Sequence, residues 1–292
     1  MANLREIRDR ISSVKSTQQI TKAMKMVAAA RLRKAQENVI ATRPYVAGLQ
    51  SVIEKLSSST ASQNIFMKDV ENPQSILLIV IGSDRGLCGG FNSNLFRFVT
   101  DTLNQRFPGF SKDGKLSVLT IGRKAGDFFS KRDFKVIQQN NGFFDNLRFD
   151  RSAEISEAVA KAFSEGTYDA VFLAFNEFKS VIAQNRIFTK LLPVTVEEAD
   201  DDSADNIDYI FEPNAAQILD NIIPLHINMQ LWRALLESNA SEQGARMAAM
   251  DNATENAKEI IGHLNLSYNK ARQAAITTEL SEIVSGAEAL NG

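Results

Sequence analysis

The 292-residue sequence is poor in the residues that build disulfides, metal sites and acid–base machinery. Cys88 is the single cysteine, so an internal disulfide and a cysteine-rich metal site are both excluded. The two histidines, His226 and His263, lie in the C-terminal part and leave residues 58–212 without a histidine. We therefore expect no metal, no cofactor and no Ser-His-Asp catalytic set in this chain.

Long apolar runs and an excess of one charge are also missing. The longest apolar run, residues 76–81, is far shorter than the roughly 20 residues that a membrane-spanning helix needs. The single thiol fits a reducing compartment, and since the N-terminus shows no apolar signal region, any role at a membrane is expected to be peripheral. Lys and Arg number 33 against 35 Asp and Glu, and this near-neutral balance argues against a nucleic-acid partner.

The two ends of the chain have the composition and periodicity of long helices. Residues 1–57 contain one proline and one glycine, and apolar side chains recur at the alternating three- and four-residue spacing of a coiled-coil seam. Residues 213–292 carry interrupted apolar stripes and many alanines, which favour helix. Pro44 is expected to kink or interrupt the first helix, and Pro224 to bend the second.

The middle of the chain alternates strands and helices, which predicts a mostly parallel, Rossmann-like α/β sheet. Residues 57–64 have the composition of a linker, and residues 197–208, with seven acids and no base, that of a solvated loop. The domains expected are 1–57, 58–212 and 213–292. The strands expected are 76–81, 116–121, 134–137, 170–175 and a hairpin partner at 186–194, with helices over about 94–105, 124–130 and 153–163.

Charge and length suggest how the two terminal helices are used. Residues 1–57 hold eleven Lys and Arg and four Asp and Glu, whereas residues 213–292 hold five and nine, so the helices should pair in antiparallel fashion. If both start from the α/β domain, the second overshoots by about twenty residues, or ~30 Å. A lone amphipathic helix is not stable in water, so residues 273–292 imply a sleeve supplied by another protein.

The glycine-rich loop at residues 82–90 follows a strand and precedes a helix, where α/β folds hold phosphates. Its spacing fits neither G-x-G-x-x-G nor G-x-x-x-x-G-K-[ST], and no Lys-Ser/Thr pair is present for phosphate and magnesium. These absences favour a structural turn over a nucleotide site. Cys88 is then a loop or core thiol, because no histidine of the α/β domain is available to activate it.

Four segments resemble the gamma subunit of F-type ATP synthases, and they fall in that family's order. They are the N-terminal residues 7–30, the loop 82–89, and the C-terminal stretches 240–250 and 276–289. Residues 100–205 match in pattern alone. The resemblance is to the bacterial type, because a single cysteine leaves no place for the regulatory dithiol of the chloroplast type.

The resemblance implies a non-catalytic rotor shaft, with a Rossmann-like foot and a coiled coil turning inside the ring of alpha and beta subunits. The epsilon subunit and the membrane c-ring would be partners at the foot. The chain would be peripheral to the cell inner membrane on its cytoplasmic side and would couple proton flow to ATP synthesis in the beta subunits. The implied ring contacts are Met24, Arg246, Arg272, Gln273 and Thr277, and the implied foot contacts are Tyr209 and Glu212.

Two other functions stay open on the sequence alone. A nucleotide-using α/β enzyme would bind nucleotide as an isolated chain, and a homodimeric coiled-coil scaffold would be a dimer in solution.

Gly244 departs from the family pattern, which usually has alanine at this position, and this glycine should soften its helix.

Overall fold

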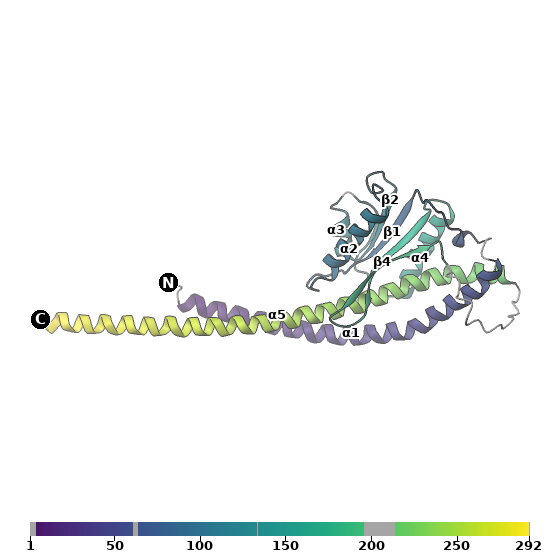
Figure 1. Ribbon diagram of the computed structural model, residues 1–292. Helices are drawn as coiled ribbons and strands as arrows, with labels where there is room; N and C mark the ends of the chain where they lie inside the picture. Colours follow the sequence, from purple (N-terminus) through teal and green to yellow (C-terminus); the bar gives the residue numbers. More distant parts are fainter. Residues whose placement is uncertain (1–3, 61–63, 133, 196–213, 292) are drawn as a thin grey trace. The chain divides into compact units, whose positions relative to one another are not determined.

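The computed structural model describes residues 4–60, 64–132, 134–195 and 214–291. It forms two compact units, a helical unit (Met1–Ala28 with Met247–Gly292) and an α/β unit (Ala29–Arg246). Two long helices, α1 (Leu4–Thr60) and α5 (Ala215–Asn291), contribute to both units (Figure 1).

A five-stranded sheet forms the centre of the α/β unit, with the strand order β3-β2-β1-β4-β5. Strands β1, β2, β3 and β4 pair in parallel, and β5 pairs antiparallel to β4. The strands are β1 (Ile76–Ile81), β2 (Leu116–Ile121), β3 (Lys135–Asn140), β4 (Ala170–Phe178) and β5 (Gln184–Leu192). The shorter helices are η2 (Ile65–Met67), α2 (Phe91–Arg106), α3 (Arg123–Phe129) and α4 (Phe149–Ser164).

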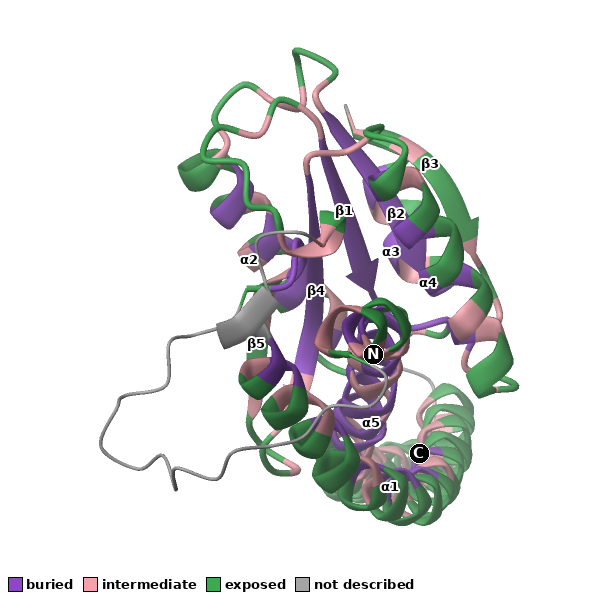
Figure 2. Cartoon of the chain, turned by 90° about the vertical axis from the view of Figure 1, so that its right-hand side faces the viewer, coloured by how far each residue is buried: buried purple, intermediate pink, exposed green. Residues whose placement is uncertain are grey.

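Helices cover both faces of this sheet, as the buried apolar strands require. Side chains of β1 alternate between two cores: Ile76, Leu78 and Val80 pack with α2 and α3, and Leu77, Ile79 and Ile81 with α4 and α5. Figure 2 shows β1, β2 and β4 buried along most of their length, whereas the edge strand β3 is largely exposed. The predicted bounds of the first two strands match those of β1 and β2. The third strand is predicted at 134–137, which falls short of the end of β3 because β3 is polar and lacks a clear apolar run.

Helix α5 contributes to the helical unit and also forms a layer of the α/β unit. Its residues Leu219, Ile223, Ile227, Leu231 and Leu235 belong to the core on the α4 face of the sheet. Gly244 faces the β4–β5 hairpin, and a Cβ at this position would make ordinary van der Waals contacts, 3.4 Å from the ring of Phe178 and 3.6 Å from Val181, so packing here does not require glycine.

In the helical unit, α1 and α5 run antiparallel, as predicted. Arg8 donates to the hydroxyl of Tyr268 at 2.8 Å, and Lys25 pairs with Asp251 at 2.6 Å, so residue numbers fall along α5 as they rise along α1. In the α/β unit, Leu32, Ala35 and Val39 of the predicted seam are buried within one chain. This internal pairing favours an intrachain coiled coil over a homodimeric scaffold.

Neither proline interrupts its helix. The possible interruption predicted at Pro44 is wrong, because α1 continues from Leu4 to Thr60, and α5 likewise runs through Pro224. Val46, Ile53 and Leu56 on the C-terminal side of Pro44 are buried, so tertiary packing holds the helix where its own hydrogen bonding is weakened.

Candidate functional site

The glycine-rich loop, residues 82–90, lies at the carboxyl end of β1, where α/β proteins bind phosphates. Here the chain supplies its own anion. One carboxylate oxygen of Asp84 accepts hydrogen bonds from the backbone N–H groups of Arg123 (3.1 Å) and Gly142 (2.7 Å), and the other accepts from Phe144 N–H (2.9 Å). Asp84 is 7% exposed. These donors belong to the segments that follow β2 and β3, so Asp84 ties the loop after β1 to both of them as a structural joint.

The loops after β1 and β2 approach closely at this joint. Gly122 has φ +93°, and a Cβ there would lie 2.4 Å from the carbonyl oxygen of Gly82, so this position requires glycine. Asn92 accepts from Ser83 N–H at 3.0 Å, and its amide nitrogen donates to the Ser83 hydroxyl at 2.7 Å. The loop is thus held from within and from α2.

Cys88 is a core thiol, as the sequence predicts. It is 2% exposed and packs with Phe91 and Ala245, and burial raises the pKa of its thiol. A buried thiol with a raised pKa is a poor nucleophile at neutral pH. Its neighbour Leu87, with φ +63°, is 68% exposed and presents an apolar side chain to solvent.

Arg246 fastens this loop to α5. Its Nη2 donates to the carbonyl oxygens of Arg85 (3.2 Å) and Gly86 (3.1 Å), and its Nη1 pairs with Glu242. Burial raises the pKa of the Glu242 carboxyl, and the charge of Arg246 opposes that rise. Arg246 is 9% exposed and serves this intrachain contact, while its predicted contact with a partner ring stays a prediction.

A second ion pair, between the half-exposed Arg43 and the buried Glu237, joins α1, α5 and β4. Glu237 is 0% exposed and accepts from Arg43 Nε (3.0 Å) and Nη2 (2.8 Å) with one oxygen, and from Phe178 N–H (3.1 Å) with the other. Sequence reasoning missed this pair and the role of Asp84. The one local signal for the pair was an acid, Glu237, directly after Leu235 and Leu236.

The other predicted ring-contact residues lie in the helical unit. Met24 is half-buried on α1, near the Lys25–Asp251 pair. Arg272 and Gln273 are exposed on α5, and the exposed Thr277 donates to the Gln273 carbonyl at 3.0 Å. Tyr209 and Glu212, the predicted foot contacts, lie outside the described residues.

The C-terminal part of α5 carries an exposed apolar stripe. Arg8, near the start of α1, reaches Tyr268, and residues 276–288 are all exposed. Ile276, Leu280 and Ile283 are 48%, 57% and 67% exposed. This agrees with the predicted overshoot. The side chain of Leu290, the last member of the predicted stripe, lies outside those described.

Neither a metal centre nor a membrane span emerges from the described ranges. Over residues 4–60, 64–132, 134–195 and 214–291, no group of three or more His, Cys, Asp or Glu side chains is placed to hold a metal ion. In the same part of the chain, no helix is both long and apolar enough to cross a membrane.

We expect the isolated chain neither to hydrolyse ATP nor to bind it tightly. Loop 82–90 has no lysine, and therefore no Lys-Ser/Thr pair to hold phosphate and magnesium, and the buried carboxylate of Asp84 in this loop would repel a phosphate. Calorimetric titration of the chain with magnesium-ATP is the measurement. A saturable low-micromolar site that disappears on changing Arg85 or Gly86 would contradict this reading and favour the enzyme alternative.

The family model, the curated relatives and the solved structures that this chain resembles are all ATP synthase proteins. The family model described as ATP synthase matches residues 3–290. The ATP synthase gamma chain of Prosthecochloris aestuarii is 50% identical over 100% of both chains, and that of Chlorobaculum tepidum is 48% identical over 99% of both. The central stalk/c-ring structure of Tetrahymena thermophila mitochondrial ATP synthase contains a chain of 29% identity and TM-score 0.60, which covers 80% of this chain and 99% of that one. The chain therefore belongs to the gamma-chain family of F-type ATP synthases, whose members form the non-catalytic rotor shaft of the enzyme.

Proposed function

We propose that this chain is the rotor shaft that turns inside a ring of alpha and beta subunits. The observation that carries the proposal is the end of α5, where residues 276–288 are exposed and bear an apolar stripe. Such a helix needs an apolar sleeve, and the ring of catalytic subunits is the sleeve that the family provides. Proton flow through the membrane c-ring would turn the shaft, and its asymmetry would drive the beta sites through successive nucleotide affinities.

The ion pairs made by the buried carboxylates Glu237 and Glu242 suit the transmission of torque. Arg43–Glu237 and Arg246–Glu242 fix α5 against α1, β4 and the loop after β1. A joint built from buried hydrogen bonds and close packing yields little under load, because the interior is close-packed. The α/β unit would then pass rotation to the long helices without slipping.

The finer assignments belong to the same proposal. Residues 1–57 and 213–292 would be the shaft helices, and residues 58–212 the foot that meets the epsilon subunit and the c-ring. Met24, Arg246, Arg272, Gln273 and Thr277 would face the ring, and Tyr209 and Glu212 the foot partners. The complex would hold the chain at the cytoplasmic side of the cell inner membrane as a peripheral subunit.

Pull-down of the tagged chain should recover alpha, beta, epsilon and c subunits, and recovery of copies of this chain alone would contradict the proposal.

Removing the residues after Thr278 is expected to weaken assembly or torque while the α/β unit stays folded. The deletion takes away Leu280 and Ile283, whose exposed side chains are the ones in need of a sleeve. Yield of assembled complex and ATP-driven proton pumping measure the first effect, and circular dichroism of the truncated chain measures the second. Loss of the sheet signal would show that the tail is part of the fold of the α/β unit.

Met24→Lys is expected to lower coupling without weakening binding of the shaft. A new ammonium group at this half-buried position would donate to an acidic lever of the beta subunit in one rotary state, a bond of about 1.5–3 kcal/mol. An interaction made in one state raises the barrier to leaving it. The ratio of proton pumping to ATP hydrolysis in assembled complexes is the measurement, with Met26→Lys, at a residue that is 60% exposed, as control. An unchanged ratio would remove Met24 from the coupling residues.

A further inference from the structure

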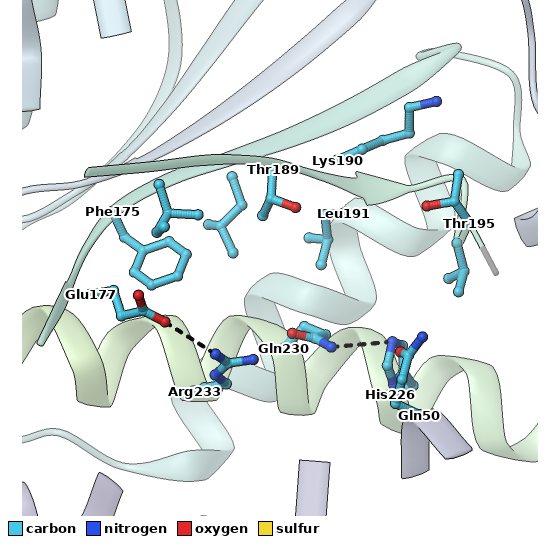
Figure 3. Close-up of a pocket in the computed structure, with 13 residues that line it drawn as sticks. Gln50, Phe175, Glu177, Thr189, Lys190, Leu191, Thr195, His226, Gln230 and Arg233 are labelled. Atoms are coloured by element: carbon cyan, nitrogen blue, oxygen red, sulfur yellow. Dashed lines mark hydrogen bonds and ion pairs between the residues drawn. The ribbon is translucent and has the colours of Figure 1, made fainter. Parts of the chain in front are cut away.

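Two cavities of the α/β unit lie beside α5, and their polar groups differ in availability. One lies between α5 and the strands β4 and β5 and has a volume of about 350 Å³ (Figure 3). Gln230 lies 3.4 Å from His226 on its helix wall, and Arg233 pairs with Glu177 at 3.4 Å. The atoms His226 Nδ1 and Arg233 Nε, which have no partner among the described residues, are closed off from solvent and therefore not available to a ligand.

The second cavity has a volume of about 370 Å³ and lies between α1, α5 and the segment that follows β3. This volume falls in the range of roughly 300–1,000 Å³ that is typical of small-molecule sites. Its lining residues lie between positions 31 and 243, so the whole cavity belongs to the α/β unit. Its walls combine the aromatic side chain of Trp232 with amides and cations.

Four amide side chains line the second cavity and make no hydrogen bond with any described residue. Gln243 is 6% exposed, and a side chain buried to this extent usually has a hydrogen-bond partner. Its amide atoms are not closed off from solvent, so a ligand in the cavity can reach them. Each amide offers both hydrogen-bond donors and an acceptor. The four residues are Asn38, Asn146, Asn239 and Gln243.

The cavity is elongated along α5 and has a different chemistry at each end. Trp232 and Gln243, which both line it, are eleven residues and about 16 Å apart along the helix. Arg43 of α1 pairs with Glu237 of α5, and the two helices are antiparallel, so α1 residues before Arg43 face α5 residues after Glu237. One end therefore holds Trp232, and the other holds Gln243 together with the α1 side chains of the cavity wall, which all precede position 43.

The Gln243 end is positively charged. Arg31 and Lys34 are exposed on α1 and make no hydrogen bond or ion pair within the part of the chain that the structure describes. Asp145, an acid of the same cavity wall, is paired with Arg85 at 2.9 Å, so its charge is offset. The two free cations therefore favour a ligand with a negative group at this end.

We propose that this cavity binds a linear disaccharide that carries a phosphate at one end. Sugar hydroxyls, like amides, both donate and accept hydrogen bonds, so they match the four amide side chains. The C–H groups on the face of one sugar ring would pack on Trp232, and the phosphate would lie at Arg31 and Lys34. The ligand would bridge α1 and α5 and stabilise their contact, which is a property separate from the rotor role.

Titration of the full chain with cellobiose 6′-phosphate tests this site, followed by calorimetry and by the fluorescence of Trp232, the one tryptophan of the sequence. Binding should be saturable and should change the emission of Trp232. Cellobiose lacks the phosphate, and glucose 6-phosphate is too short to reach both ends of the cavity. Each of these two should bind at least about tenfold more weakly at matched ionic strength, because the contacts of one end are lost.

Two variants locate the binding. Lys34→Met removes one cation at an exposed position, and Gln243→Leu replaces the unpartnered amide by an apolar side chain of similar size. Each should weaken binding of cellobiose 6′-phosphate at least about tenfold. Arg33→Met, a change of the neighbouring exposed arginine outside the cavity wall, should leave binding unchanged. Circular dichroism checks that Gln243→Leu is folded, and Lys34→Met decides the test if it is not.

Absence of saturable binding would overturn the proposal, as would equal binding of cellobiose 6′-phosphate and glucose 6-phosphate. Binding that survives both Lys34→Met and Gln243→Leu would place the sugar elsewhere and would also overturn it. A loss of binding in Arg33→Met as large as that in Lys34→Met would reduce the effect to the general positive charge of α1.

Discussion

Arg43→Met is expected to lower the free energy of unfolding of the α/β unit by about 3–5 kcal/mol, because it leaves the carboxylate of Glu237 buried without its partner. Glu237 is 0% exposed, and both contacts from the Arg43 guanidinium go to one of its oxygens. Glu237→Leu should cost less, about 1–3 kcal/mol. In that variant the half-exposed Arg43 regains water, and Phe178 N–H is the group left unpaired.

Urea unfolding followed by fluorescence of Trp232 measures both effects. This single tryptophan packs edge-to-face on Phe149 within the α/β unit, with ring centroids 5.7 Å apart. The double variant Arg43→Met/Glu237→Leu should recover part of the loss, because neither charge then remains unpaired. Glu37→Gln, in the exposed pair with Arg33, serves as control and should change stability little. Equal costs for the two single variants would show that burial of Glu237 is not the decisive factor.

The sequence predicts the elements whose signal is local. Strands β1 and β2 are continuous apolar runs between turn residues, and their observed bounds match the predicted ones. Helix α2 begins at Phe91, three residues before the predicted start, because Gly90 precedes it without a side-chain cap to mark the boundary. At Pro44 the interruption that the sequence allowed does not occur, since buried contacts further along α1 hold the helix through it.

The joints between elements are not visible in the sequence. Arg43 and Glu237 are 194 positions apart, and the amides that Asp84 accepts from belong to loops 39 to 60 positions away. Nothing in the local pattern distinguishes these charges from solvated ones, so their roles depend on the closed fold. Contacts with other subunits depend in addition on the assembled complex. The roles of Met24, Arg272, Gln273 and Thr277 therefore stay predictions of the family resemblance.

Asp84→Ala is expected to lower the free energy of unfolding of the α/β unit by about 3–5 kcal/mol, since hydrogen bonds from three backbone N–H groups to a buried carboxylate are lost together. The stability of Asp84→Asn should fall between that of the wild-type chain and that of Asp84→Ala. Its remaining oxygen can accept from Arg123 and Gly142 N–H, but its amide nitrogen would face the N–H of Phe144. Asp145→Asn changes a nearby carboxylate that is 58% exposed and pairs with Arg85, and it should have a small effect.

If Asp84 replaces a bound anion, inorganic phosphate should partly restore the stability of Asp84→Ala. The lost carboxylate uncovers three N–H groups around one small space, an arrangement suited to an oxyanion. The same phosphate should leave the wild-type chain unaffected, because its donors are already taken. Urea midpoints with and without phosphate, at matched ionic strength, give the comparison. An equal shift in both proteins would reduce the effect to a general salt effect. An unchanged midpoint for Asp84→Ala without phosphate would show that the three hydrogen bonds contribute little to stability.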